Sequence, residues 1–138
     1  MQVLHPPVKP FVSTGAGDNN NSVVLKLTYG DATFLLPADV ERVAEQYLLG
    51  SGADLRADVL VAPHHGSRTS SSPEFLKAVA PSVVAVSAGL DNRFHHPHRE
   101  TMEAFARLQG FPKVFITARD GSIVFESDGS RLWVNARK

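Results

Sequence analysis

Short apolar runs alternate with amphipathic segments along the chain. Runs rich in Val, Leu, Phe and Ile predict strands at 24–27, 33–36, 58–62, 82–86, 113–117, 122–126 and 131–134. Apolar positions that repeat on one helical face predict helices over 40–49, 72–79 and 99–109. Because buried strands alternate with helices, we expect an α/β fold with a mixed β-sheet and flanking helices.

Residues typical of turns and helix caps mark where these segments begin and end. Three prolines and a Gly/Asp/Asn cluster make residues 1–21 an extended lead-in, so the folded domain is expected over 22–138. Gly30-Asp31 predicts a turn, and Asp120-Gly121 and Asp128-Gly129 predict two hairpin turns. Ser72 followed by a proline predicts a capped helix start.

Composition narrows the chemistry. The 138 residues suit one domain or one large piece of a domain, and the absence of cysteine excludes disulfides and thiolate metal ligands. The 14 basic and 14 acidic residues balance, so any contact with nucleic acid should be local rather than spread over a basic surface. No apolar run of membrane-spanning length or signal pattern is present, so the chain itself is expected to be soluble.

Histidines gather in two loops that each follow a predicted buried strand. His64 and His65 form the first group, and 95–98 holds three more of the six histidines. Asp39 follows a third strand. Because sites gather beyond the carboxyl ends of strands in α/β sheets, Asp39, His65 and His96 should lie together. Imidazole and carboxylate are ligands for Zn, Mn or Fe, so this edge is a candidate metal site.

Neighbouring polar residues have two interpretations. The Ser67, Thr69 and Ser70 hydroxyls suit phosphate oxygens, but serines in a loop also serve as turn and cap residues. Asp39 could instead be the N-cap of the helix over 40–49. His5, beside two prolines, is expected to be structural.

Several segments are similar to the metallo-β-lactamase domain of ComEC-type DNA-internalisation (competence) proteins. Residues 19–25 (NNNSVVL) resemble the N-D-N-S-L-V-L of that family, and 34–39 (FLLPAD) resemble its F-L-L-T-G-D. Residues 53–67 (ADLRADVLVAPHHGS) resemble A-D-L-x-A-D-V-L-K-V-P-H-H-G-S, and 91–98 (DNRFHHPH) resemble D-N-R-Y-G-H-P-H.

The resemblance implies the C-terminal half of an αββα fold with a two-metal site. It implies that Asp39 and His65 are metal ligands, with His64 a further candidate, and that His96 and His98 contact the scissile phosphate or protonate the leaving group. Asn21 and Ser67 become candidate phosphate contacts. The H-x-H-x-D-H motif of the family lies in the N-terminal half and is not in this sequence. The complete domain is expected to hold Mn or Zn, and the isolated chain to hold it weakly or not at all.

One departure bears on the metal site. T-G-D has become Pro37-Ala38-Asp39. Proline removes an amide donor and stiffens φ, and alanine is expected not to take the left-handed backbone that glycine accepts, so Asp39 is expected to be re-aimed.

The leading hypothesis is a portion of a metal-dependent nuclease or phosphodiesterase domain for DNA uptake during competence. The alternatives are a catalytically inactive binding or scaffold module, and hydrolysis of a small phosphoester or lactone. The resemblance implies DNA and the N-terminal half of the domain as partners. Because a half-domain exposes an apolar face that its other half would cover, a second copy of the chain is a further candidate partner. The resemblance also implies a membrane-bound parent with this domain outside the lipid on the extracytoplasmic side.

Overall fold

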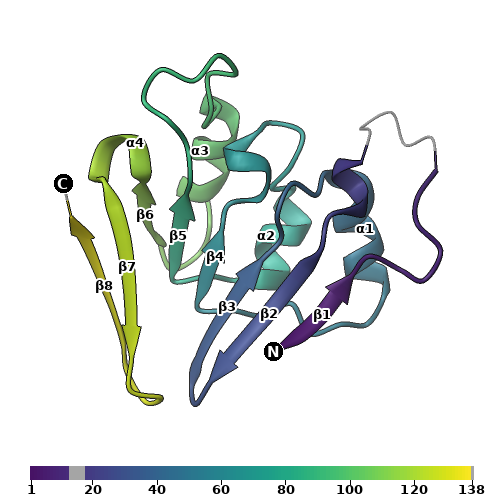
Figure 1. Cartoon of the computed structure of the whole chain (residues 1–138), viewed down its shortest axis with the longest axis horizontal. Coiled ribbons are helices and arrows are strands. Elements are labelled where there is room, and N and C mark those ends of the chain that lie inside the picture. The colour runs from purple at the N-terminus through teal and green to yellow at the C-terminus, as the bar shows by residue number, and fades with distance from the viewer. Residues whose placement is uncertain (13–17, 138) are drawn as a thin grey trace.

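A six-stranded mixed sheet organises the molecule (Figure 1). The computed structural model describes residues 1–12 and 18–137. The strands, in their order across the sheet, are β1 (Gln2–His5), β2 (Val24–Tyr29), β3 (Ala32–Leu36), β4 (Val59–Val61), β5 (Val83–Val86) and β6 (Lys113–Ile116). The first three strands are antiparallel, whereas β3 to β6 are parallel. The predicted mixed α/β sheet is therefore confirmed.

Three helices cover one face of this sheet. They are α1 (Arg42–Gly50), α2 (Pro73–Val79) and α3 (Arg99–Ala106). Each helix connects two neighbouring parallel strands, and right-handed crossovers in one direction place all of them on the same side. Phe75, Leu76 and Phe105 of these helices are buried together with Leu35 and Leu60 of the sheet. Among the described residues, no helix has the length and apolar character needed to cross a bilayer.

The C-terminal strands form a separate two-stranded sheet. They are β7 (Ser122–Ser127) and β8 (Leu132–Arg137), and Asp128 Oδ1 accepts hydrogen bonds in the turn that joins them. The predicted Asp128-Gly129 hairpin is confirmed. The Asp120-Gly121 hairpin is wrong, because a single helical turn, α4 (Thr117–Asp120), separates β6 from β7. Asp120 Oδ2 accepts from the Ile116 N–H at 2.8 Å and so braces that turn.

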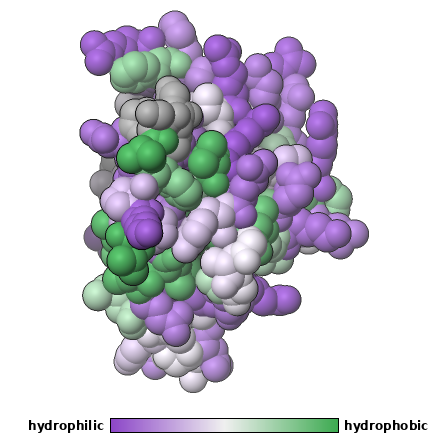
Figure 2. Space-filling model, turned by 90° about the vertical axis from the view of Figure 1, so that its right-hand side faces the viewer, coloured by the Kyte–Doolittle hydropathy of each residue, from purple (hydrophilic) through white to green (hydrophobic). Residues whose placement is uncertain are grey.

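The β7–β8 sheet lies over part of the face that the helices leave free. Phe34, which alternates with the helix-facing Leu35, makes an edge contact with Phe125 at 5.6 Å between ring centroids. Toward β1 the same face is less covered. It presents the half-buried Leu25, Leu27, Leu36 and Val61 and the 62% exposed Val3, which pairs with Leu25; we call these five residues the open sheet face. Figure 2, which views the β1 and α1 side, shows hydrophobic residues gathered on one half of this flank.

The N-terminal segment contributes to the fold beyond the predicted lead-in. Residues 2–5 pair with β2 as an edge strand, which the sequence pattern did not predict. His5 is fully buried, and its Nε2 lies 2.7 Å from the Asn20 carbonyl of the short 3-10 helix η1 (Asn19–Asn21). The predicted turn in this segment falls largely on residues 13–17, which lie outside the described residues.

Helix α1 takes its cap from this N-terminal segment. Asn20 Oδ1 accepts hydrogen bonds from the Glu41 and Ala44 backbone N–H groups at 3.1 and 3.2 Å. The alternative in which Asp39 is the N-cap is therefore wrong. Asp39 therefore does not cap the helix, and its carboxylate faces His65.

Candidate metal centre

The carboxyl ends of the four parallel strands meet at one edge of the sheet. Asp39 follows β3, His64-His65 follow β4 and Ser87 follows β5, while Thr117 begins α4 directly after β6. The loop that follows β5 also carries the second histidine group and leads into α3. This is the edge at which open α/β sheets place their sites, and the predicted convergence of Asp39, His65 and His96 is confirmed by their contacts.

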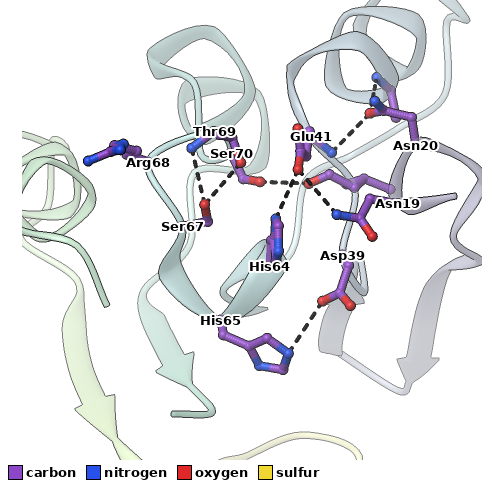
Figure 3. Close-up of polar contacts among 12 residues, drawn as sticks. Asn19, Asn20, Asp39, Glu41, His64, His65, Ser67, Arg68, Thr69 and Ser70 are labelled. Carbon is purple, nitrogen blue, oxygen red and sulfur yellow. Dashed lines mark hydrogen bonds and ion pairs between the residues drawn. The ribbon is translucent and has the colours of Figure 1, made fainter. Parts of the chain in front are cut away.

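Asp39 and His65 face one another across this edge (Figure 3). His65 Nε2 lies 3.5 Å from Asp39 Oδ1, and about half of each side chain is exposed. The other ring nitrogen, Nδ1, lies 2.8 Å from the Ser87 carbonyl. Because a carbonyl only accepts, Nδ1 carries a proton, and in the neutral ring Nε2 is left with the lone pair that faces Asp39.

The pair fits two ligands of one metal ion. In a tetrahedral site with bonds of about 2.0–2.1 Å, neighbouring ligand atoms are roughly 3.3–3.4 Å apart, close to the 3.5 Å between these two atoms. Metal-binding histidines usually donate their second N–H to a carbonyl or carboxylate, as His65 does to Ser87. No group of three or more potential ligands is assembled among the described residues. The edge therefore offers two candidate ligands, fewer than a metal site generally takes.

The backbone around the pair is unusual. Seven non-glycine residues of the described chain have positive φ, and four of them adjoin this edge: Ala38, His64, His65 and His95. Such conformations cost on the order of 1–2 kcal/mol each and gather at functional sites. Ala38 has φ 51°, so the prediction that alanine could not take the glycine-like conformation is wrong. Its carbonyl accepts from the His64 N–H at 2.9 Å, which ties the β3 loop to the β4 loop.

His64 belongs to a different polar group from His65. Its Nδ1 lies 3.2 Å from Glu41 Oε1, which also accepts from Asn19 Nδ2 at 3.2 Å. Figure 3 shows the His64 ring joined to Glu41, whereas the His65 ring is joined to Asp39. The contact supports a positioning role, in which Glu41 holds the loop that presents His65. Metal ligation by His64 stays a prediction.

His96 lies at the centre of the histidine group. Its ring centroid is 6.4 Å from that of His65, 5.6 Å from that of His64 and 4.8 Å from that of His98. Burial lowers the pKa of His96 below its ordinary value, and the neighbouring histidines lower that pKa further, while Asp39 opposes the shift. The shift favours the neutral imidazole.

The two histidine loops are locked together at Gly66. Its carbonyl accepts from the His98 N–H at 3.0 Å, and a Cβ built on Gly66 would lie 2.6 Å from Pro97 Cβ. His98 Nδ1 in turn accepts from the Arg68 backbone N–H at 3.1 Å. Because that nitrogen accepts, the neutral ring carries its proton on Nε2 and is a hydrogen-bond donor there.

Asn92 positions His96 and was given no role from the sequence. Its side chain accepts from the His96 N–H and donates to the His96 carbonyl, both at 2.8 Å. It also donates to the Gly89 carbonyl at 2.8 Å. The signal was present in the D-N-R-F segment, because asparagine in a loop commonly bonds nearby backbone groups.

Two residues predicted to contact phosphate have internal contacts instead. Ser67 is 4% exposed, and its hydroxyl lies 2.9 Å from that of Thr69. Asn21 exchanges hydrogen bonds with the backbone N–H and carbonyl of Phe11 at 2.8 and 3.0 Å. The structure gives both a role in holding loops, and phosphate contact from either stays a prediction.

The fold and this edge define a mixed α/β domain with a candidate metal centre. In comparisons, the chain is similar to ComE operon protein 3 of Bacillus subtilis, with 33% identity over 118 residues that cover 86% of this chain and 15% of that protein. It is also similar to competence protein ComA of Neisseria gonorrhoeae, with 36% identity over 119 residues that cover 86% of this chain and 17% of that protein.

Recombination protein 2 of Haemophilus influenzae is a further relative, with 37% identity over 92 residues that cover 67% of this chain and 11% of that protein. No family model matches the chain. The chain is thus related to competence-related proteins, and it spans 11% to 17% of the length of these three relatives.

Proposed function

We propose that this chain forms part of a metal-dependent phosphodiester-hydrolysing site that acts on DNA during competence. The observation that carries the proposal is the Asp39–His65 pair, whose separation and Ser87 contact suit two ligands of one divalent metal. The positive-φ residues around it support a functional edge. The competence-related relatives support DNA as the substrate class.

The metal, Mn or Zn, would polarise a phosphoryl oxygen and supply a nucleophilic water. Asp39 and His65 would hold it, and the Ser87 carbonyl would keep the His65 ring in the ligating tautomer. Glu41 would position the loop through His64. These roles rest on the positions of Asp39 and His65 after the ends of β3 and β4 and on the lone pairs that their side chains offer a metal.

His98 would act on the phosphate as a hydrogen-bond donor. Its Nδ1 is engaged by the Arg68 N–H, so Nε2 carries the only ring proton. A neutral ring in this tautomer can stabilise negative charge on a phosphoryl oxygen. It cannot readily give up that proton, because the imidazolate that would remain is a strong base. Phosphate contact is therefore favoured over protonation of the leaving group.

A second segment would complete the centre. A catalytic zinc site generally takes three protein ligands, and a two-metal site takes more, whereas the described residues assemble no group of three. The open sheet face, with Val3 62% exposed, gives such a segment an apolar surface on which to pack. We propose a β-sheet segment with further His and Asp ligands as the partner, in an αββα metallo-β-lactamase arrangement. A second copy of the chain is the competing occupant.

A cleavage assay with Mn²⁺ tests the proposed function. The chain alone is expected to cleave linear DNA little or not at all. Addition of a polypeptide that carries an H-x-H-x-D-H half should produce cleavage, and His65→Ala should abolish it. The matched control is His95→Ala, an exposed histidine of the neighbouring loop, which should leave cleavage intact. DNA binding without cleavage in the completed mixture would favour the scaffold alternative.

A further inference from the structure

An exposed aromatic ring stands beside the candidate metal centre. Phe94 is 57% exposed, and its ring stacks on His96 with 5.7 Å between centroids and 23° between planes. The Arg93 guanidinium lies over the Phe94 ring, 4.7 Å from its centroid. The sequence shows no basic stripe interleaved with aromatics. The fold nevertheless places one basic and aromatic pair, Arg93 and Phe94, beside His96.

A pocket opens between this ring and the ligand pair. It has a volume of about 440 Å³, and its lining includes Phe94, His96, His65, Asn92 and Thr117. This volume lies within the range of roughly 300–1,000 Å³ typical of small-ligand sites. Because His65 lines it, a group bound in the pocket is adjacent to the atoms that would hold the metal and the phosphate.

The chemistry of the pocket suits a flat aromatic group attached to an anion. An exposed phenyl ring gives a base a stacking surface, and stacking is tolerant of base identity. The Arg93 guanidinium is itself planar and can stack on a base or pair with its phosphate. The Asn92 amide sits on the pocket wall, but its contacts to His96 and Gly89 commit it to the loop. The pocket therefore selects by stacking rather than by hydrogen bonds to a particular base.

We propose that Phe94 and this pocket form a nucleobase subsite, in which an unpaired base of a DNA strand stacks on Phe94 while its phosphate lies at the Asp39–His65 edge. This inference rests on the proposed function and specifies which form of DNA the site binds. A base stacked on Phe94 must be out of the duplex, so the site takes single-stranded DNA or a frayed end.

Fluorescence anisotropy in the presence of a chelator tests the subsite without metal or cleavage. The probes are a labelled oligothymidylate, an abasic strand of equal length and charge, and a blunt duplex. Stacking of one base contributes about 1–3 kcal/mol, so the wild-type chain should bind the thymidylate roughly 5- to 150-fold more tightly than the abasic strand. The duplex should bind no better than the abasic strand.

Variants separate stacking from general binding. Phe94→Ala should remove the preference for bases and leave the abasic affinity unchanged, whereas Phe94→Tyr should retain the preference. Phe111→Ala is the matched control, because Phe111 is 85% exposed and precedes β6, at the opposite end of the strands from the site. Thermal melts should show that both alanine variants remain folded.

Equal wild-type affinity for the abasic and base-containing strands, or a preference that survives Phe94→Ala, would overturn the subsite. Absence of binding to any probe would overturn it as well. A base preference that depends on Phe94, with no cleavage in the completed metal-containing mixture, would instead refute only the hydrolytic function.

Discussion

Adding one methyl group at Gly66 should push the two histidine loops apart. Gly66→Ala would place a Cβ 2.6 Å from Pro97 Cβ and 3.1 Å from Pro97 Cα, and the residue has φ 82°. The left-handed backbone costs an L-residue about 1–2 kcal/mol. Overpacking typically costs a further 1–3 kcal/mol or so. The free energy of unfolding should therefore fall by roughly 2–5 kcal/mol.

Gly52→Ala gives the matched control. Gly52 also has positive φ, at 75°, but a Cβ there meets nothing within 4 Å. It should show only the backbone cost of about 1–2 kcal/mol. Urea unfolding measures both, and the slope is on the order of 1–3 kcal/mol per molar for small proteins. The excess loss in Gly66→Ala isolates the Pro97 contact.

The same variant has a readout at the site. Because Pro97 lies between His96 and His98, its displacement should shift the imidazole NMR signals of both, whereas Gly52→Ala should leave them in place. If Gly66→Ala destabilised the chain no more than Gly52→Ala does, the inferred interlock of the two loops would be refuted.

Four further changes test other contacts. Ala38→Gly should leave the unfolding free energy unchanged or raise it by up to about 1 kcal/mol in urea titrations, because relief of the positive φ offsets the added unfolded-state freedom. Asn92→Ala should lower stability by roughly 1–3 kcal/mol and broaden the His96 NMR signals, because the His96 backbone loses two hydrogen bonds. The pKa of His96 should lie below 6.5 when measured by NMR, and Asp39→Asn should lower that pKa further. Because the unfolded chain then binds this proton more readily than the folded chain, the free energy of unfolding should fall as pH falls below 6.5. Burial raises the pKa of Glu45 above 4.5, so stability should fall as pH rises from 4.5 through the folded pKa, and Glu45→Gln should remove that component of the pH dependence.

Much of the fold could be predicted because its elements carry strong local patterns. The helices and the strands from β2 to β6 bury alternating or periodic apolar positions that remain visible in the sequence. β1 was missed because four residues before two prolines carry little pattern, and only pairing with β2 makes them a strand. Asp120-Gly121 was misread because the dipeptide favours a tight hairpin turn, whereas the Asp120 side chain stabilises a helical turn.

The site was predictable where it depended on strand ends. Asp39 and His65 were placed together because parallel strands end at the same edge. The Ser87 carbonyl that fixes the His65 tautomer could not be found, because a backbone group leaves no mark in the sequence. Ala38 shows a related limit, since tertiary hydrogen bonds hold a backbone conformation that the side chain disfavours.

Calorimetric titration with Zn²⁺ or Mn²⁺ tests most directly whether Asp39 and His65 form a metal-ligand pair. We expect the wild-type chain to bind the metal weakly at a single site. Asp39→Asn and His65→Ala should each weaken binding at least about 10-fold, because loss of even a residue that supports a metal ligand typically weakens binding by about 10- to 100-fold. His95→Ala should bind as the wild type does. Equal binding by all four proteins would contradict the account, as would tight binding of two metals by the isolated chain.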